Sequence, residues 1–280
     1  MAGRRKMMKR AVSNALDAVV GLVLVVMSIY PILWLFSISF QSDQSAYQTP
    51  TRWLFVPTFN NYQKLLSDPN FVNSLSNSIQ LTVIATLLCV LFGALAAYGL
   101  SRYRIRGAVT ITLVFAITRL VPSFAIVIPT FYIYRQLNLL DTMFGLILAL
   151  VAFQVPLTTL IMYRIMNAIS PSLDEAAHID GAGFVRVFWQ IIMPIARPGL
   201  AASAVVTFIL IWNEFLFILV LAGNRVVTIP MTIASFQTDK QILWGSIAAA
   251  STISLVPIVL IVVLAQRHLL SGLGMGSVRE

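Results

Sequence analysis

The stretch Ser170–Leu200, SPSLDEAAHIDGAGFVRVFWQIIMPIARPGL, is the longest polar interruption in the second half of a largely apolar chain. Two helix starts compete within it. Ser172 and Glu175 have the S-x-x-E spacing of a capping box, whereas Ser170–Pro171 places proline at the first helical position. With either start, Asp174 and Glu175 lie at the positive end of the helix dipole. The pattern predicts a short polar helix between two apolar segments.

The same stretch also contains signals that end helices. Gly181 and Gly183 predict a left-handed stop after the short helix. A second amphipathic segment, residues 185–192, is expected to be broken by Pro194 and Pro198. The pair Ala176 and Ala177 predicts a surface of small residues that another protein can approach closely.

Composition places this loop in a membrane protein. Of the 280 residues, 59% are hydrophobic and 10% are charged, against about a quarter charged in soluble domains. An ordinary soluble enzyme is therefore excluded. The net charge of +9 does not indicate nucleic-acid binding, because the basic residues lie at the ends of apolar runs without interleaved aromatic residues.

Six apolar runs are long enough to cross a bilayer, which takes about 20 residues. The first, from about residue 15 to 40, exceeds the apolar region of a signal peptide and predicts a retained span. The others cover about residues 71–100, 108–134 (with kinks at Pro122 and Pro129), 142–166, 200–222 and 244–265. The expected fold is an all-α integral membrane protein with six transmembrane helices. Its predicted parts are a cytoplasmic basic N-terminus (1–13), the first span (14–40), an extracytoplasmic loop (41–70), a core (71–267) and a cytoplasmic tail (268–280).

Basic residues orient these spans. Six spans place both termini on one side, and that side collects 13 of the 19 Lys and Arg residues, against five on the other side and Arg119 within a span. The positive-inside bias predicts that both termini and the loop 170–200 are cytoplasmic. The 13 residues are Arg4, Arg5, Lys6, Lys9, Arg10, Arg102, Arg104, Arg106, Arg164, Arg186, Arg197, Arg267 and Arg279; the five are Arg52, Lys64, Arg135, Arg225 and Lys240.

The order Glu175-Ala176-Ala177, Asp180-Gly181-Ala182, then Pro194 and Pro198, resembles the EAA loop of ABC-importer permease subunits. Residues 73–267 are similar to the permease core domain of that family. Thr118–Pro129, Trp212–Phe215 and Ala265–Leu273 resemble its carbohydrate-importing branch, which includes the maltose and glycerol-phosphate permeases.

This resemblance implies a type I importer architecture whose loop 170–200 carries a coupling helix seated in a cleft of the ATPase. The coupling residues would be Leu173, Glu175, Ala176, Ala177, His178, Asp180, Gly181 and Ala182. It further implies a multi-pass protein of the cell inner membrane that moves a small-molecule sugar. The implied partners are a second, homologous permease subunit, a cytoplasmic ATP-binding subunit dimer and an extracytoplasmic solute-binding protein.

Neither a nucleotide site nor a metal cluster is evident in the sequence. None of the four lysines follows a glycine in the P-loop pattern, so ATP and Mg²⁺ are expected on the partner ATPase and this chain is not expected to be an enzyme. The histidines His178 and His268 suggest no ligand set, and His178 is expected to be a surface or contact residue. Cys89, the only cysteine, is expected to be a small packing residue.

Polar residues within the spans are the candidates for a solute pathway. Arg119 and Glu214 are the charges deepest in the apolar runs, where a charge costs on the order of 3 kcal/mol. They either line the pathway and interact with each other, or extend to a nearby interface. Ser123, Gln154 and Asn213 are suited to sugar hydroxyls, but equally to hydrogen bonds between helices.

Other functions remain open at this point. An importer of a non-sugar solute shares every feature above except the branch resemblance. An ion-coupled secondary transporter would need paired carboxylates or half-repeats, and only Glu214 qualifies. A non-transporting scaffold would dock a cytoplasmic partner through the same loop.

Overall fold

The structure is a computed structural model that describes residues 2–42, 46, 55–103, 105–238 and 241–274. Within these ranges it contains helices, turns and one isolated antiparallel bridge between Gln237 and Ile242. Four of the basic residues counted above (Arg52, Arg104, Lys240 and Arg279) and the last six residues of the predicted tail lie outside the described residues. The chain forms two compact units, Met1–Asp68 with Phe236–Ile253, and Pro69–Ser235 with Ser254–Glu280.

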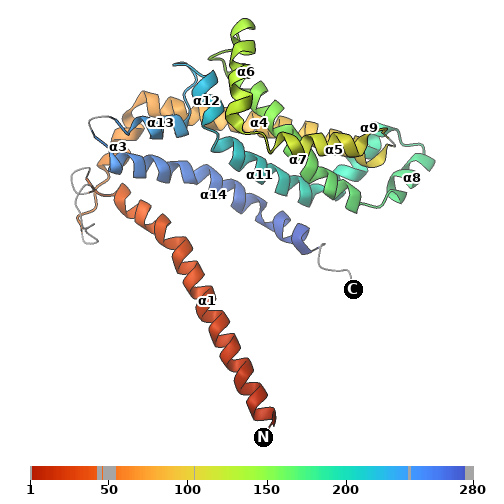
Figure 1. Cartoon of the computed structure of the whole chain (residues 1–280), viewed down its shortest axis with the longest axis horizontal. Coiled ribbons are helices and arrows are strands. Elements are labelled where there is room, and N and C mark those ends of the chain that lie inside the picture. The colour runs from red at the N-terminus through yellow and green to blue at the C-terminus, as the bar shows by residue number, and fades with distance from the viewer. Residues whose placement is uncertain (1, 43–45, 47–54, 104, 239–240, 275–280) are drawn as a thin grey trace. The chain divides into compact units, whose positions relative to one another are not determined.

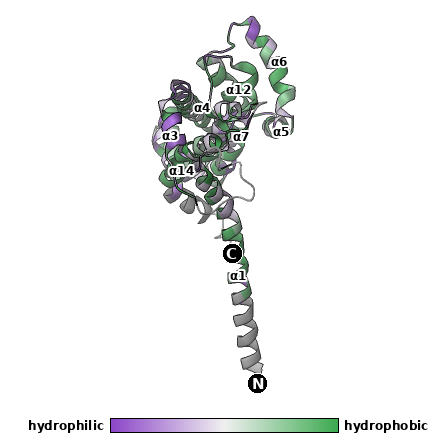
Figure 2. Ribbon diagram, turned by 90° about the vertical axis from the view of Figure 1, so that its left-hand side faces the viewer, coloured by the Kyte–Doolittle hydropathy of each residue, from purple (hydrophilic) through white to green (hydrophobic). Residues whose placement is uncertain are grey.

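The first unit contains α1 (Ala2–Ser39), α3 (Asn60–Ser67) and the beginning of α14 (Trp244–Gly274). In Figure 2, α3 is coloured as hydrophilic, unlike the long helices. Its Asn61 amide donates to the carbonyls of Ser39 at 2.9 Å and Gln41 at 2.7 Å, and the Tyr62 and Ser39 hydroxyls lie 2.6 Å apart. The two bonds from Asn61 satisfy backbone acceptors that the end of α1 leaves free.

The second unit carries the loop helix and most of the remaining spans (Figure 1). Its helices are α4 (Pro69–Arg102), α5 (Ala108–Thr118), α6 (Ser123–Gln136), α7 (Met143–Ala168), α8 (Ser172–Ile179), α9 (Phe184–Arg186), the π-helix η1 (Val187–Ile192), α10 (Met193–Ile195), α11 (Arg197–Trp212), α12 (Leu216–Leu221), α13 (Ile229–Ser235) and the rest of α14. Helices dominate because a membrane span must satisfy its backbone hydrogen bonds internally.

Four helices are long and apolar enough to cross a membrane: Leu16–Ser39, Pro69–Arg102, Met143–Ala168 and Trp244–Gln266. Two bent pairs make up to six spans. Ala108–Thr118 and Ser123–Gln136 meet at 96°, and Phe184–Ile195 and Arg197–Trp212 meet at 79°. Four of the six expected runs are therefore single long helices and the third is the bent α5–α6 pair, whereas the second bent pair begins in the loop at Phe184 and covers only the first part of the expected run 200–222.

The breaks differ in part from those the prolines predict. The third run turns sharply between α5 and α6, where Pro122 caps α6, but Pro129 lies inside α6 without ending it. The fifth run is not continuous, because Asn213–Phe215 separates α11 from α12. Pro194 and Pro198 flank Ala196, where Phe184–Ile195 bends by 79° into Arg197–Trp212, so the helix breaks between these two prolines as expected.

Helices α4, α7 and α11 form the centre of the second unit. Gly93 of α4 approaches Thr158 of α7, and the Thr158 and Thr207 hydroxyls join α7 to α11 at 3.0 Å. Ser203 of α11 donates to the sulfur of Met162 at 3.4 Å. Cys89 is fully buried here, as its expected packing role requires. Small residues and short hydroxyls allow close approach of apolar helices.

Candidate functional site: the loop helix and its junction

Helix α8 begins from the proline start rather than the capping box. Pro171 has helical angles at the N-cap, and no side chain caps the helix. The Ser172 hydroxyl lies 2.8 Å from the Ser170 hydroxyl, so the predicted capping box is wrong. The backbone N–H groups of Asp174 and Glu175 instead donate to the Pro171 carbonyl, at 3.0 and 3.2 Å. Both acids lie in the first turn, as expected from the dipole.

The end of α8 depends on Gly181. Its φ is +79°, in the left-handed region that glycine adopts without steric penalty. The Ala182 N–H donates to the Ala177 carbonyl at 2.9 Å, the six-to-one bond of a Schellman motif. The His178 Nδ1 lies 2.9 Å from the Ala182 carbonyl. Gly183 is extended (φ −75°, ψ 166°), so the predicted left-handed stop falls on Gly181 alone.

The two alanines do not share one surface. Ala177 is 7% exposed and packs in a cluster with Val187, Phe188 and Ile192, so its predicted place on an exposed surface is wrong. Ala176 is exposed, as are Glu175, His178 and Asp180. Leu173 is 40% and Ile179 is 86% exposed. Leu173 and Ile179 are therefore apolar side chains that an otherwise polar helix leaves accessible.

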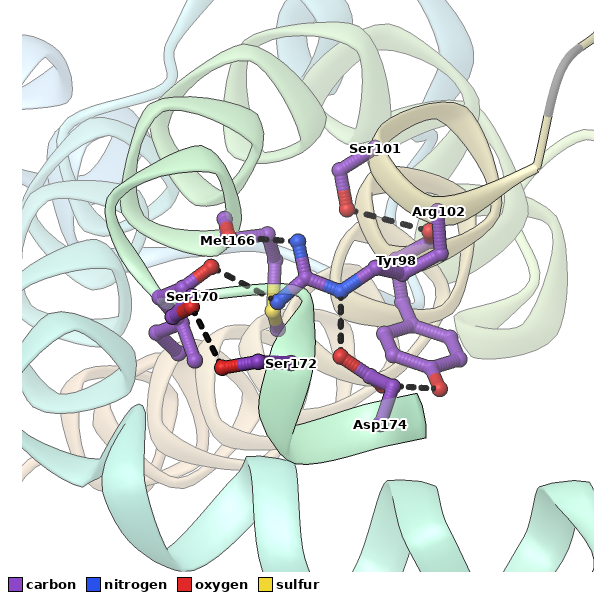
Figure 3. Close-up of polar contacts among 8 residues, drawn as sticks. Tyr98, Ser101, Arg102, Met166, Ser170, Ser172 and Asp174 are labelled. Atoms are coloured by element: carbon purple, nitrogen blue, oxygen red, sulfur yellow. Dashed lines mark hydrogen bonds and ion pairs between the residues drawn. The ribbon is translucent and has the colours of Figure 1, made fainter. Parts of the chain in front are cut away.

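A buried junction ties α8 to two other helices (Figure 3). The Arg102 Nε of α4 donates to Asp174 Oδ2 at 2.6 Å, and the Tyr98 hydroxyl donates to Asp174 Oδ1 at 2.7 Å. The two remaining nitrogens of Arg102 donate to the carbonyls of Met166 (3.1 Å) and Ile169 (2.9 Å), at the end of α7. The guanidinium therefore satisfies carbonyls that α7 leaves free at its end.

Sequence reasoning missed this junction. In the sequence, Arg102 indicates only the orientation of the spans and Asp174 only the positive end of a helix dipole, and no pattern marks Tyr98. No local signal joins them, because 72 positions separate Arg102 from Asp174. The sequence offers only a general signal: a carboxylate and an arginine near the ends of neighbouring spans tend to pair where water is scarce.

The two charged candidates for the solute pathway each lie in a short segment between two helices. Arg119, between α5 and α6, stacks over the Phe153 ring at 4.6 Å and donates to the Phe153 carbonyl at 3.2 Å. Glu214, between α11 and α12, accepts the Phe217 N–H at 3.1 Å and so caps α12. Glu214 attracts Arg119 electrostatically, but the described residues include no direct ion pair between them.

The other three candidates have separate environments. The exposed Asn213 donates its amide to the Ile209 carbonyl at 2.8 Å, and the half-buried Ser123 begins α6. Gln154 is 2% exposed, and its Oε1 has no hydrogen-bond partner in the protein. A buried amide oxygen without a partner calls for water or a polar ligand.

A second junction, also missed, joins the α6–α7 turn to the segment after α12. Asp141 Oδ1 accepts the N–H groups of Gly223 (2.9 Å), Arg225 (3.1 Å) and Val226 (3.2 Å). Burial alone would raise the pKa of Asp141. The backbone N–H donors lower this pKa by more than burial raises it, so the pKa lies below its ordinary value. A Cβ on Gly223 would lie 2.7 Å from Asp141 Oδ2, so this close approach requires glycine.

The lowered pKa predicts how this second junction responds to pH. Its stabilisation is fully present above the ordinary pKa of about 3.9 and is lost as the pH falls through the lowered value. Hydrogen exchange of amides 223–226, corrected for intrinsic rate, should stay constant from about pH 8 to 5 and accelerate below about pH 4. Asp141→Asn should accelerate it several-fold at pH 7, whereas Asp180→Asn, which changes an exposed carboxylate on another loop, should not. Equal exchange in the two variants would contradict this role for Asp141.

The fold and loop define a helical, multi-pass membrane protein with a structured polar helix between two spans. Residues 89–274 match the family model described as the inner membrane component of binding-protein-dependent transport systems, and the chain belongs to this family. It is 33% identical to the trehalose transport system permease protein of Mycobacterium tuberculosis, covering 94% of this chain and 96% of the relative. It is 32% identical to the trehalose/maltose transport system permease protein of Thermococcus litoralis, covering 97% and 99%. A solved bacterial ABC transporter that imports the acidic polysaccharide alginate superposes with a TM-score of 0.77 at 25% identity, covering 92% of this chain and 96% of that one.

Proposed function

We propose that this chain is the permease subunit of a carbohydrate ABC importer and that α8 is its coupling helix on the cytoplasmic side. The observation that carries the proposal is the form of α8: a helix ended by a left-handed glycine, held by a buried ion pair, with Leu173 and Ile179 exposed. The named relatives support a sugar as solute, because their solutes are trehalose, maltose and alginate. The bias of 13 basic residues against five supports cytoplasmic termini.

In this mechanism, ATP binding closes two ATPase subunits, one of which holds α8 in a cleft. The displacement of α8 moves the adjoining spans and exchanges outward for inward access. Each permease chain supplies one such helix, so a second, homologous permease is needed for the second ATPase. An extracytoplasmic binding protein delivers the solute. The coupling contacts would come from Leu173, Glu175, Ala176, His178, Ile179 and Asp180 on the exposed surface, with Ala177, Gly181 and Ala182 shaping the helix.

The direct test is reconstitution of this chain into proteoliposomes with a second permease subunit, ATPase subunits and a solute-binding protein. We expect uptake of a labelled disaccharide or oligosaccharide that requires internal ATP and external binding protein. Uptake that persists without ATP but stops with an ionophore would favour the secondary transporter instead. A cysteine at Ala176 in a Cys89→Ala background should react with a membrane-impermeant maleimide in inside-out vesicles only; reaction in right-side-out vesicles would overturn the orientation.

The protruding Ile179 side chain is expected to be a main contact of α8 with the ATPase. Ile179→Asp should lower both uptake and binding-protein-stimulated ATP hydrolysis by about tenfold or more, since a central apolar contact contributes about 2 kcal/mol or more. Ile179→Val, which stays apolar, should remain within about twofold of wild type. The amount of the subunit in the membrane should be equal in all three proteins, because this side chain is exposed in the isolated chain. Normal coupling in Ile179→Asp would remove Ile179 from the interface.

We also assign the solute pathway to the helix breaks that carry Arg119, Ser123, Asn213 and Glu214, together with the buried Gln154 of α7. Broken helices are tolerated at membrane depth where they line a cavity or lie within protein. Arg119→Ala and Glu214→Ala should each lower the maximal uptake rate about tenfold while the assembled complex persists, because each removes a charge from this region. Ser76→Ala, on the exposed side of α4, is the control and should not change uptake. Normal rates in both variants would place the pathway elsewhere.

A further inference from the structure

The hydrogen bonds around Arg102 join the ends of three helices. Arg102 and Tyr98 come from α4, Asp174 from α8, and the two carbonyl acceptors from the end of α7. Both oxygens of Asp174 are occupied, and all three guanidinium nitrogens donate. The Arg102 and Asp174 side chains are 7% and 9% exposed. In such a buried site, removing one charged partner leaves the other without compensation, so the pair holds its geometry strongly.

The chain itself does not fix α8. Only three residues, 169–171, link α8 to α7. At its other end, α8 is followed by Gly181 and Gly183, which are open to solvent. Packing of Ala177 against η1 contributes a single small side chain. The directional bonds to Arg102 and Tyr98 are therefore what set the angle at which α8 presents Leu173 and Ile179.

We propose that Arg102 is the positioning residue of the coupling step, transferring the movement of α8 directly to α4 and α7. This inference rests on the proposed function of α8. Without Arg102, α8 would still reach an ATPase cleft but would turn about its two connections, and its displacement would not be passed on to the spans. The planar guanidinium is needed because its three nitrogens reach three separated acceptors, whereas the three donors of a lysine ammonium all diverge from a single nitrogen.

The experiment measures the position of α8 by distances between spin labels. Labels are placed at Ser172 on α8 and Asn167 on α7, both exposed and neither among the proposed ATPase contacts, in the Cys89→Ala complex with its partners. Arg102→Gln alone leaves Asp174 buried and unpaired and can fail to fold. The decisive variant is therefore Arg102→Gln with Asp174→Asn, which removes both charges together. Arg106→Gln, which removes an exposed charge four positions further on, is the matched control.

We expect a narrow distance distribution in the unsubstituted and Arg106→Gln complexes, equal with and without ATP, because α8 and α7 move together. The double variant should assemble, but its distribution should be at least twofold wider and its binding-protein-stimulated ATP hydrolysis at least tenfold lower. Arg102→Lys, which keeps only the charge and part of the bonding, should give an intermediate width. A narrow distribution with normal stimulation in the double variant would overturn the inference.

A separate measurement tests the proposed function of α8 independently of the role of Arg102. A label at Ile179 should lose mobility when the ATPase subunits are added, whatever happens at Arg102. If it does not, α8 is not the docking helix, even where the distance from α8 to α7 stays fixed. If it does, and the double variant still transports normally, α8 docks but Arg102 does not position it.

Discussion

Gly181→Val is expected to reduce sugar uptake by at least tenfold while basal ATP hydrolysis continues. Gly181 has a φ of +79°, where a β-branched side chain clashes with its own backbone. Staying in the left-handed region costs a non-glycine residue on the order of 1–2 kcal/mol, and leaving it breaks the Schellman bond from Ala182 to Ala177. The end of α8 would then unwind, and Ile179 would lose its fixed position. The same substitution should uncouple hydrolysis from transport, as we expect also for Glu175 variants.

Gly183→Val is the matched control for this experiment. Gly183 lies two positions away in the same loop, and a Cβ at either glycine meets no atom within 4 Å. The two positions differ in backbone angle, since Gly183 is extended and accepts valine readily. Uptake and stimulated hydrolysis, measured in proteoliposomes, should therefore stay near wild type in Gly183→Val. Equal loss in both variants would show that the left-handed turn is not the cause.

Gly93→Leu should strongly lower the thermal stability of the assembled subunit. A Cβ at Gly93 would lie 2.9 Å from Thr158 Cγ2 and 3.2 Å from the Thr158 carbonyl carbon. Thr158 has little freedom to move, because its hydroxyl bonds to Gln154 and lies 3.0 Å from Thr207. Overpacking at such a site costs about 3 kcal/mol, and α4 would be forced away from α7.

The measurement is thermal unfolding of the purified complex together with the amount of subunit in the membrane. Gly99→Leu, on the same helix, is the control, because a Cβ there meets no atom within 4 Å. We expect a lower unfolding temperature and several-fold less protein for Gly93→Leu only. Equal behaviour of the two variants would mean that α4 and α7 do not pack as closely as described.

Much of the fold could be predicted because it depends on local apolar length. The runs that became α1, α4, α7 and α14 needed only a count of residues against the thickness of a bilayer. The glycine at the end of α8 could also be predicted, since Gly181 follows a short amphipathic segment. The breaks could not be placed reliably, because Pro129 is accommodated inside α6 whereas Asn213–Phe215, without any proline, ends α11.

The candidate site was less accessible to sequence reasoning, since its defining contacts are long-range. The exposed residues of α8 could be named from the loop, but Ala177 turned inward because one face of so short a helix must pack on η1. The sequence does not show which residue pairs with Asp174, because its pairing with Arg102 depends on where α4 ends relative to α8. The bonds from Asp141 to residues 223–226 are of the same kind: a carboxylate in one turn organises another turn more than 80 positions away.

The π-helical segment η1 limits how the loop can vary in length. An α-helix advances 100° per residue, and a π-helical turn accommodates about one residue more than an α-helical one. Two backbone hydrogen bonds, from the Ala196 N–H to the Ile192 carbonyl (2.8 Å) and from the Leu200 N–H to the Ala196 carbonyl (2.9 Å), connect this segment to α11 across the 79° bend. Val187, Phe188 and Ile192 of η1 are buried in the same cluster as Ala177 of α8. Surface loops usually tolerate insertions and deletions, but losing or gaining one residue in Val187–Ile192 should displace these buried side chains and with them the packing of α8.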